Sequence, residues 1–327
     1  MALTTESDFK QFYEISLQSD LKELEIRRLT VANRVRTLLI FELIIFIVIM
    51  IYAIWFRPEK ETPMPGPDLG IIFWIIGSLV ILGVIFVFIT ARISKKFRKL
   101  YKQNIIGKLI TQISEDLTYF PEDKIEFNEF KNSRIYNQNI ATYKGRDLVT
   151  GNLGKMNFRF SWLEVYARTM PDHRKKSQYH LLFRGIFFIA DFRKTFSADA
   201  VIFPNVSKKF GLGLIGRLLQ EAHLGSVVIL DDPQFEKEYS VHSEQSENAK
   251  KLVTPGLRQW LIDFREKTKS QVFLSFTDTK MNMGVFLKRQ LFEPPIFKKV
   301  DNYDYILENF RYLMLFHGLI EDMGKSI

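Results

Sequence analysis

The stretch that decides the fold is TLLIFELIIFIVIMIYAIWF, residues Thr37–Phe56, and LGIIFWIIGSLVILGVIFVFITA follows at Leu69–Ala91. About 20 helical residues, rising about 1.5 Å each, cross the ~30 Å hydrocarbon core of a bilayer. Both stretches reach this length, and the core helices of soluble proteins seldom run so far without a polar face. The first stretch is also too long for the apolar part of a cleaved signal peptide. The sequence therefore predicts two transmembrane helices, 37–56 and 69–91.

Lysine and arginine predict how these helices are oriented. They are frequent before the first stretch and after the second, whereas the loop 57–70 carries only Arg57 and Lys60. By the positive-inside rule, both termini face the cytoplasm, and 57–70 is a short extracytoplasmic loop. Glu42 is the one charged residue within either stretch. We interpret it as a carboxylate that reaches the interface or pairs with Arg92 or Thr90, since an ion path needs several polar groups at mid-depth.

Helical patterns continue on the cytoplasmic side of both stretches. Residues 1–36 are expected to form an N-terminal cytoplasmic helix, in which a near-heptad apolar stripe is interrupted by Arg28. Residues 92–118 are expected to form a basic juxtamembrane helix that Pro121 ends. This segment has seven basic and two acidic residues, and it predicts attraction to anionic lipid rather than to nucleic acid, because its charge lies next to the bilayer. Its proposed lipid-binding residues are Lys95, Lys96, Arg98, Lys99 and Lys102.

The rest of the chain, 119–327, has the size of a single domain. It shows no regular alternation of strands and helices, which predicts an α+β domain with a mainly antiparallel sheet. Strands are predicted at Lys124–Phe130, Met156–Val165, Tyr179–Asp191, Ala200–Phe203, Ser226–Leu230, Gln271–Phe276 and Lys280–Phe286, the last two forming a hairpin. Helices are predicted at Leu212–Ala222, at Pro255–Lys267 with Thr254 as its N-cap, and at Asp301–Met323.

Four blocks of this domain resemble a known family. They are FRGIFFIADFRKTF (Phe183–Phe196), LDDPQFEKEYSVHSEQSENAKKLVTP (Leu230–Pro255), FEPP (Phe292–Pro295) and YKGRDLVTGNLG (Tyr143–Gly154). Together they resemble the bacterial two-span membrane proteins called domain of unknown function 3137, over most of residues 119–300. The sequence departs from the family pattern at Ala198-Asp199, where a turn glycine is expected, and at His242, where tyrosine is expected. The resemblance implies the fold and the two spans, and it implies no catalytic residues.

Motifs for catalysis are incomplete. Residues 211–216 spell G-x-G-x-x-G, but Pro204 and polar residues separate them from the preceding strand, which argues against a dinucleotide site. These glycines remain a candidate phosphate or lipid-headgroup site together with Lys208, Lys209 and Arg217. Asp231 and Asp232 end an apolar strand, as in magnesium-binding hydrolases, but the matching phosphate loop is missing and a turn with a helix cap is the favoured interpretation.

Asp191, inside an apolar strand, is the third candidate catalytic carboxylate, although a structural acid paired with Arg184 or Arg193 is favoured. The chain has no cysteine, and its histidines have no metal-site spacing, so no metal and no cofactor are expected. The leading hypothesis is a membrane-anchored cytoplasmic domain that binds a protein partner or itself and has no evident catalytic site. The alternatives are recognition of an anionic lipid or phosphate ligand, and a membrane-tethered enzyme that uses the three aspartates.

Overall fold

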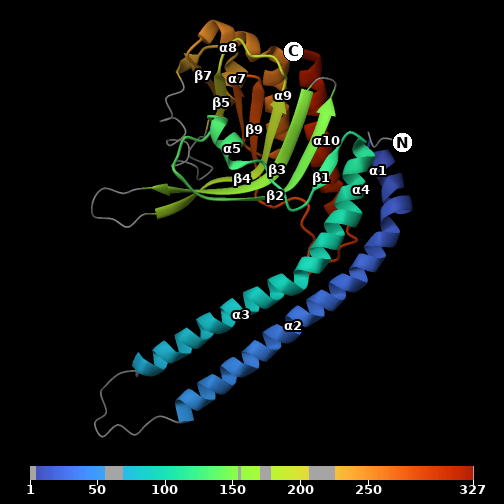
Figure 1. Cartoon of the computed structure of the whole chain (residues 1–327), viewed down its shortest axis with the longest axis vertical. Helices are drawn as coiled ribbons and strands as arrows, with labels where there is room; N and C mark the ends of the chain where they lie inside the picture. Colours follow the sequence, from blue (N-terminus) through green and yellow to red (C-terminus); the bar gives the residue numbers. More distant parts are fainter. Residues whose placement is uncertain (1–4, 56–68, 154–155, 170–177, 206–224, 327) are drawn as a thin grey trace. The chain divides into compact units, whose positions relative to one another are not determined.

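The structure is a computed structural model that describes residues 5–55, 69–153, 156–169, 178–205 and 225–326 (Figure 1). The chain divides into two compact units. Unit 1 consists of Met1–Phe9, Gly107–Phe292 and Asp304–Ile327, and unit 2 consists of Lys10–Ile106 and Glu293–Tyr303. The segment Glu293–Tyr303 therefore belongs with the helices of unit 2, although the sequence places it inside the C-terminal domain. Residues 57–68 of the predicted loop 57–70 lie outside the described residues.

Both predicted apolar stretches are confirmed as parts of long helices. Residues Glu6–Trp55 are helical throughout, as α1 (Glu6–Phe12), the π-helical η1 (Tyr13–Leu17) and α2 (Gln18–Trp55). The second rod consists of α3 (Leu69–Tyr101), the π-helical η2 (Lys102–Gly107) and α4 (Lys108–Ile113). In unit 2, α2 and α3 pack against each other as a hairpin (Figure 1). The second rod ends at Ile113 and not at Pro121, because Ser114 takes an extended backbone and the chain then enters a strand.

The apolar stripe of α2 contains a buried charge. Leu21, Leu24, Val31 and Val35 are buried as the spacing predicts, and Arg28 lies among them with only 5% of its surface exposed. We call the segment Glu293–Tyr303 the strap, because its backbone is held by this part of the hairpin. The Arg28 guanidinium binds both carboxylate oxygens of Glu25 at 2.8 and 2.7 Å and donates to the carbonyl of Ile296 at 2.8 Å.

The strap has further polar contacts with both helical rods of unit 2. Glu25 accepts a hydrogen bond from the backbone N–H of Val300 at 3.0 Å, and the Tyr13 hydroxyl donates to the carbonyl of Asp301 at 2.7 Å. Glu293 lies 2.9 Å from the Nζ of Lys102, which is 3% exposed. A buried charge is tolerated only when it is paired. The strap therefore supplies the carboxylate that pairs with Lys102 and a carbonyl acceptor for Arg28, whose ion-pair partner Glu25 lies on α2.

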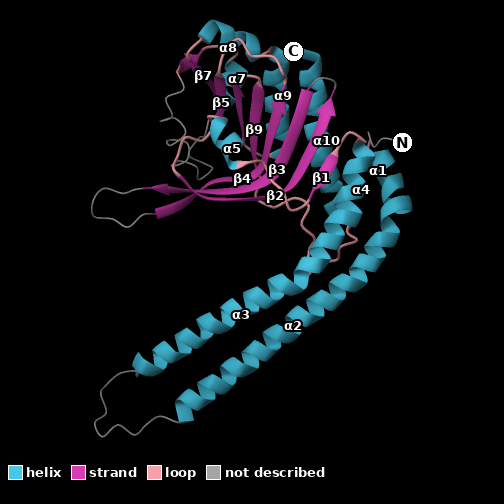
Figure 2. Cartoon of the chain, in the orientation of Figure 1, coloured by secondary structure: helices cyan, strands magenta, loops and turns pink. Residues whose placement is uncertain are grey.

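Within the described residues, unit 1 contains one nine-stranded sheet in the order β1-β2-β3-β4-β9-β8-β5-β7-β6 (Figure 2). All of its strand pairs are antiparallel, which confirms the predicted α+β class with an antiparallel sheet. The strands are β1 (Thr118–Phe120), β2 (Ile140–Leu153), β3 (Met156–Thr169), β4 (Gln178–Asp191), β5 (Ala200–Pro204), β6 (Ser226–Val228), β7 (Tyr239–Ser243), β8 (Val272–Thr277) and β9 (Lys280–Phe286). The helices are α5 (Phe127–Asn132), α7 (Pro233–Glu238), α8 (Ser246–Leu252), α9 (Pro255–Thr268) and α10 (Tyr303–Ser326).

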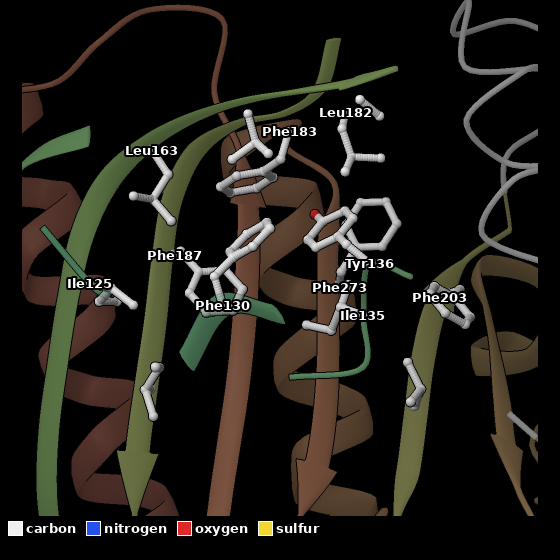
Figure 3. Close-up of a cluster of buried hydrophobic side chains, with 14 residues drawn as sticks. Ile125, Phe130, Ile135, Tyr136, Leu163, Leu182, Phe183, Phe187, Phe203 and Phe273 are labelled. Atoms are coloured by element: carbon white, nitrogen blue, oxygen red, sulfur yellow. The ribbon is translucent and has the colours of Figure 1, made fainter. Parts of the chain in front are cut away.

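Helices cover both faces of this sheet. Neighbouring residues of a strand point to opposite faces, so Phe187 and Phe188 of β4 belong to different layers. The Phe187 ring lies 4.8 Å from that of Phe130 on α5, within a cluster of buried aromatic side chains (Figure 3). The Phe188 ring lies 6.5 Å from that of Phe160, which in turn lies 5.6 Å from the ring of Phe316 on α10.

Several predicted elements are confirmed and one is wrong. The strands near 156, 179, 200 and 226, the hairpin at 271–286 and the two C-terminal helices are present. Thr254 caps α9 by accepting a hydrogen bond from the N–H of Leu257, with Pro255 in its first turn. The predicted strand Lys124–Phe130 is wrong, because Phe127 and Phe130 lie on one face of the helix α5. The predicted helix Leu212–Ala222 lies outside the described residues.

Candidate functional site

A cavity of about 920 Å³ opens in unit 1 at the C-terminal end of α9. Among the described residues that line it, six are basic and three are acidic, and we call it the cationic cavity. The basic residues are Arg184, Lys237, Arg265, Lys269, Lys288 and Arg289, and the acidic residues are Glu238, Glu266 and Glu308. These residues come from β4, α7, α9, the segment after β9, and α10, so the fold collects them from distant parts of the sequence.

The end of α9 forms one wall of the cationic cavity. Lys269 takes the left-handed conformation, with φ of 54°, and its N–H donates to the carbonyl of Arg265 at 2.8 Å. This conformation ends the helix, although it is unusual for a residue other than glycine. The chain then turns at Ser270, whose N–H donates to the Thr268 hydroxyl at 3.2 Å, and enters β8. The turn places three successive polar residues, Thr268–Ser270, on the cavity wall.

The six cations fall into two groups. Arg265 pairs with Glu238 at 2.8 Å, Arg184 pairs with Glu164 at 3.1 Å, and Arg289 pairs with Glu308. Within the described part of the chain, Lys237, Lys269 and Lys288 make no ion pair, and all three are exposed. The arginines are therefore fixed by carboxylates of the protein, whereas the three lysines are available to an anion from solution.

The cationic cavity also has an apolar wall. Leu181, Ile262 and Leu291 contribute aliphatic side chains, and Phe286 and Tyr312 contribute rings. Burial raises the pKa of the Tyr312 phenol, so this side chain is neutral near pH 7 and its hydroxyl can donate a hydrogen bond. Small-molecule sites commonly join apolar walls with a few directed polar groups. The arrangement fits an anion that carries an apolar or ring-containing part.

The three candidate catalytic aspartates do not form a site. Asp191 accepts a hydrogen bond from the N–H of Arg193 at 3.0 Å in the turn after β4. Asp232 caps α7 through the N–H of Phe235 at 3.1 Å and pairs with Arg258 at 2.9 Å. Asp231 precedes this cap with φ of 54° and is exposed. None of the three lines the cationic cavity or a second cavity that contains His242.

The predicted lipid-binding residues also fall into two groups, those exposed on the helix surface and those near a carboxylate of the strap. Lys95, Lys96 and Lys99 are exposed on α3. Arg98 and Lys102 both face Glu293 of the strap, at 3.8 and 2.9 Å. Glu42 is half-buried on α2, and the Thr90 hydroxyl donates to the carbonyl of Phe86 in its own helix. Lys208, Lys209, Arg217 and the glycines 211–216 lie outside the described residues.

Sequence reasoning missed the cationic cavity because no local pattern marks it. Its three unpaired lysines lie in three separate segments and have no common spacing in the sequence. In the sequence Arg28 is only an interruption of the α2 stripe, and the structure shows that its side chain is buried there. Among the described residues, no group of three histidine or acidic side chains is placed to hold a metal ion.

Comparison with known proteins gives one match. A family model described as "Protein of unknown function (DUF3137)" matches residues 181–325. The match includes the blocks Phe183–Phe196, Leu230–Pro255 and Phe292–Pro295, and it confirms the resemblance that they indicated, whereas Tyr143–Gly154 lies before it. No curated protein and no solved structure shows a significant match to this chain.

Proposed function

We propose a function from the geometry of the structure, because the chain belongs to the DUF3137 family and this family's description names no activity. The protein is a membrane-anchored binding protein. Its two apolar helices hold it in a bacterial inner membrane with both termini in the cytoplasm. Unit 1 binds an anionic ligand in the cationic cavity, and it acts by recognition rather than by catalysis.

The surface of the two long helices supports the membrane anchor. Both helices are long and apolar enough to cross a membrane. Only 6% and 0% of their most apolar windows are buried, whereas the core helix of a soluble protein would be mostly buried. Large side chains such as Phe41, Val48 and Phe88 are more than half exposed. Contiguous apolar surface of this kind is stable when lipid covers it, and the flanking cations favour a cytoplasmic location of both ends.

The observation that carries the ligand proposal is the presence of three unpaired lysines on one cavity that also has an apolar wall. Lys237, Lys269 and Lys288 can each contact an anionic group, and the ion-paired arginines keep the surrounding field positive. An exposed ion pair contributes about 0.2–1 kcal/mol. Loss of all three lysines should therefore weaken binding by about 0.6–3 kcal/mol, which is roughly three- to 150-fold.

Titration calorimetry on the full chain in nanodiscs of zwitterionic lipid tests this proposal. The probes are ATP, which carries both a triphosphate and an aromatic base, and inorganic pyrophosphate, which has no apolar part. The test variant is Lys237→Gln/Lys269→Gln/Lys288→Gln. The matched control is Lys131→Gln/Lys250→Gln/Lys251→Gln, which removes the same charge at exposed positions outside the cavity.

We expect ATP to bind more tightly than pyrophosphate, because the apolar wall adds contacts to the charge interaction. The cavity variant should lose roughly three- to 150-fold in affinity, and the control should stay within about twofold of the unmodified protein. Equal losses in both variants would show that net charge alone attracts the probe. That result, or the absence of binding by either probe, would overturn the proposed function.

A further inference from the structure

A second cavity in unit 1, of about 510 Å³, lies at the other end of strands β7 and β8. The cationic cavity adjoins Glu238 and Gln271, just before these strands begin. The second cavity adjoins His242 near the end of β7 and Thr277 at the end of β8. We call it the His242 cavity. Its lining also includes residues from two of the four family blocks, Phe183–Phe196 and Leu230–Pro255, and the departures from the family pattern at Ala198-Asp199 and His242.

Asp199 holds the walls of the His242 cavity together. Its carboxylate pairs with Arg134 at 2.5 Å and accepts a hydrogen bond from the N–H of Asp278 at 3.3 Å. Its carbonyl accepts a hydrogen bond from the Ser243 hydroxyl at 2.7 Å. One residue therefore connects the loop before β5 with the segment after α5, the β8–β9 turn and the end of β7. These contacts position Asp199 against three other segments that line the cavity.

His242 presents a hydrogen-bond acceptor in this cavity. It lies in β7 between Val201 of β5 and Val227 of β6, and the ring of Phe203 is 5.8 Å away. Burial in these surroundings lowers the pKa of the imidazole, so the side chain is neutral near pH 7. A neutral imidazole has one N–H donor and one nitrogen with a lone pair, so this side chain can accept a hydrogen bond.

Most of the charged side chains of the His242 cavity are carboxylates. Among the described residues that line it, Asp199, Glu244 and Asp278 are acidic and Arg134 is basic, and Arg134 is already paired with Asp199. Glu244 and Asp278 are exposed and make no ion pair within the described residues. Two unpaired carboxylates and a neutral imidazole form a set of acceptors. Such a set is matched by a cationic group that carries several N–H donors.

We propose that the His242 cavity binds a primary ammonium or guanidinium group, from a small amine or from a basic side chain. Glu244 and Asp278 supply the charge, and His242 accepts one N–H hydrogen bond. A divalent metal is not the expected occupant, since no described group of three ligating side chains can hold one. This ligand differs in charge from that of the cationic cavity and does not depend on it.

Nuclear magnetic resonance of the full chain in detergent micelles, with labelled histidine, tests the proposal. The probes are butane-1,4-diamine and its neutral analogue butane-1,4-diol, followed by the amides of N-acetyl-lysine and N-acetyl-arginine. His242→Phe assigns the imidazole signal. The test variant is Glu244→Gln/Asp278→Asn, in which asparagine tolerates the positive φ of 53° at residue 278. The control is Glu247→Gln/Asp304→Asn, which removes two exposed carboxylates elsewhere.

We expect the diamine to shift the His242 signal in a saturable way, and the diol to leave it unchanged. The cavity variant should bind the diamine at least about tenfold more weakly, with the control within about twofold of the unmodified protein. Binding of the diamine without the amino-acid amides would identify a small amine as the ligand, and binding of either amide would identify a basic side chain. Equal effects of the diamine and the diol, no effect of any amine, or full binding by the Glu244→Gln/Asp278→Asn variant would overturn the proposal.

Discussion

Replacement of Arg28 by methionine should release the strap from the helical hairpin of unit 2. Methionine keeps an apolar, flexible side chain in the stripe of α2, so the main loss is that of the guanidinium. The variant loses two hydrogen bonds to Glu25, at 2.8 and 2.7 Å, and one to the Ile296 carbonyl, at 2.8 Å. It also leaves the Glu25 carboxylate, whose side chain is 18% exposed, without its cation.

The size of this effect follows from the burial of the pair. Removal of one partner from a buried ion pair costs about 3–5 kcal/mol. Glu25 retains some exposure and its hydrogen bond from the Val300 N–H, so we expect a smaller cost of about 2–4 kcal/mol for keeping the strap in place. If the free energy of local opening of the strap falls by this amount, the rate of amide hydrogen exchange in the strap rises by roughly 30- to 1,000-fold.

Hydrogen–deuterium exchange with mass spectrometry on the full chain in micelles measures this rate, in peptides that cover Glu293–Tyr303. Arg27→Met is the matched control, because Arg27 pairs with Glu23 at 2.8 Å but the two side chains are 47% and 65% exposed. An exposed pair of this type contributes only about 0.3–0.5 kcal/mol. The control should therefore change strap exchange by no more than about twofold. Equal exchange in the Arg28→Met and Arg27→Met variants would refute the argument that the buried pair holds the strap.

Three further predictions concern unit 1. Tyr136→Phe should raise the free energy of unfolding by about 1 kcal/mol, because within the described residues the buried Tyr136 hydroxyl has no hydrogen-bond partner. A decrease in the free energy of unfolding, measured by calorimetry, would contradict this prediction. Asp232→Ala should lower stability by about 1–2 kcal/mol through loss of the α7 cap, and Asp232→Asn should lower it less, with thermal unfolding as the measurement. The pKa of His242 is lowered from 6.5, so the neutral side chain stabilises the fold above pH 6.5, and this contribution is lost as the pH falls below that value. The charged residues that line the same cavity are Arg134, Asp199, Glu244 and Asp278. The difference in stability between the unmodified protein and His242→Phe should therefore shrink on acidification, and a constant difference would contradict the assignment.

The parts of the fold that the sequence predicts are those with strong local signals. Residues that are close together in the sequence determine three of these features: the two apolar stretches, the hairpin around Asp278 and the Thr254 cap. β2 was missed because bulges near Ile140 and between Arg146 and Val149 break its alternation. At the second bulge Asp147 takes a positive φ of 64° and is fully buried, with the Tyr119 hydroxyl bonded to its carboxylate.

The candidate sites could not be predicted in the same way. Both cavities consist of residues that the antiparallel sheet brings together from distant segments. The carboxylates that the sequence does mark, Asp191 and Asp232, satisfy backbone N–H groups of nearby turns and caps. The partners of Arg28 are only partly local, since Glu25 lies one turn away and Ile296 lies 268 residues further along the chain. Spacing in the sequence therefore marks Arg28 as an interruption of the stripe but does not indicate that it is buried or what pairs with it.

The proposed membrane anchor and the proposed cytoplasmic location of unit 1 are tested most directly by cysteine labelling. The chain has no cysteine, so single-cysteine variants give an unambiguous label. Glu61→Cys places a thiol in the loop 57–70 and Lys288→Cys places one in the exposed part of unit 1. In intact cells, a membrane-impermeant maleimide should label the Glu61→Cys variant at once and the Lys288→Cys variant only after permeabilisation. Labelling of the Lys288→Cys variant in intact cells, or recovery of the protein in the soluble fraction, would contradict the claim.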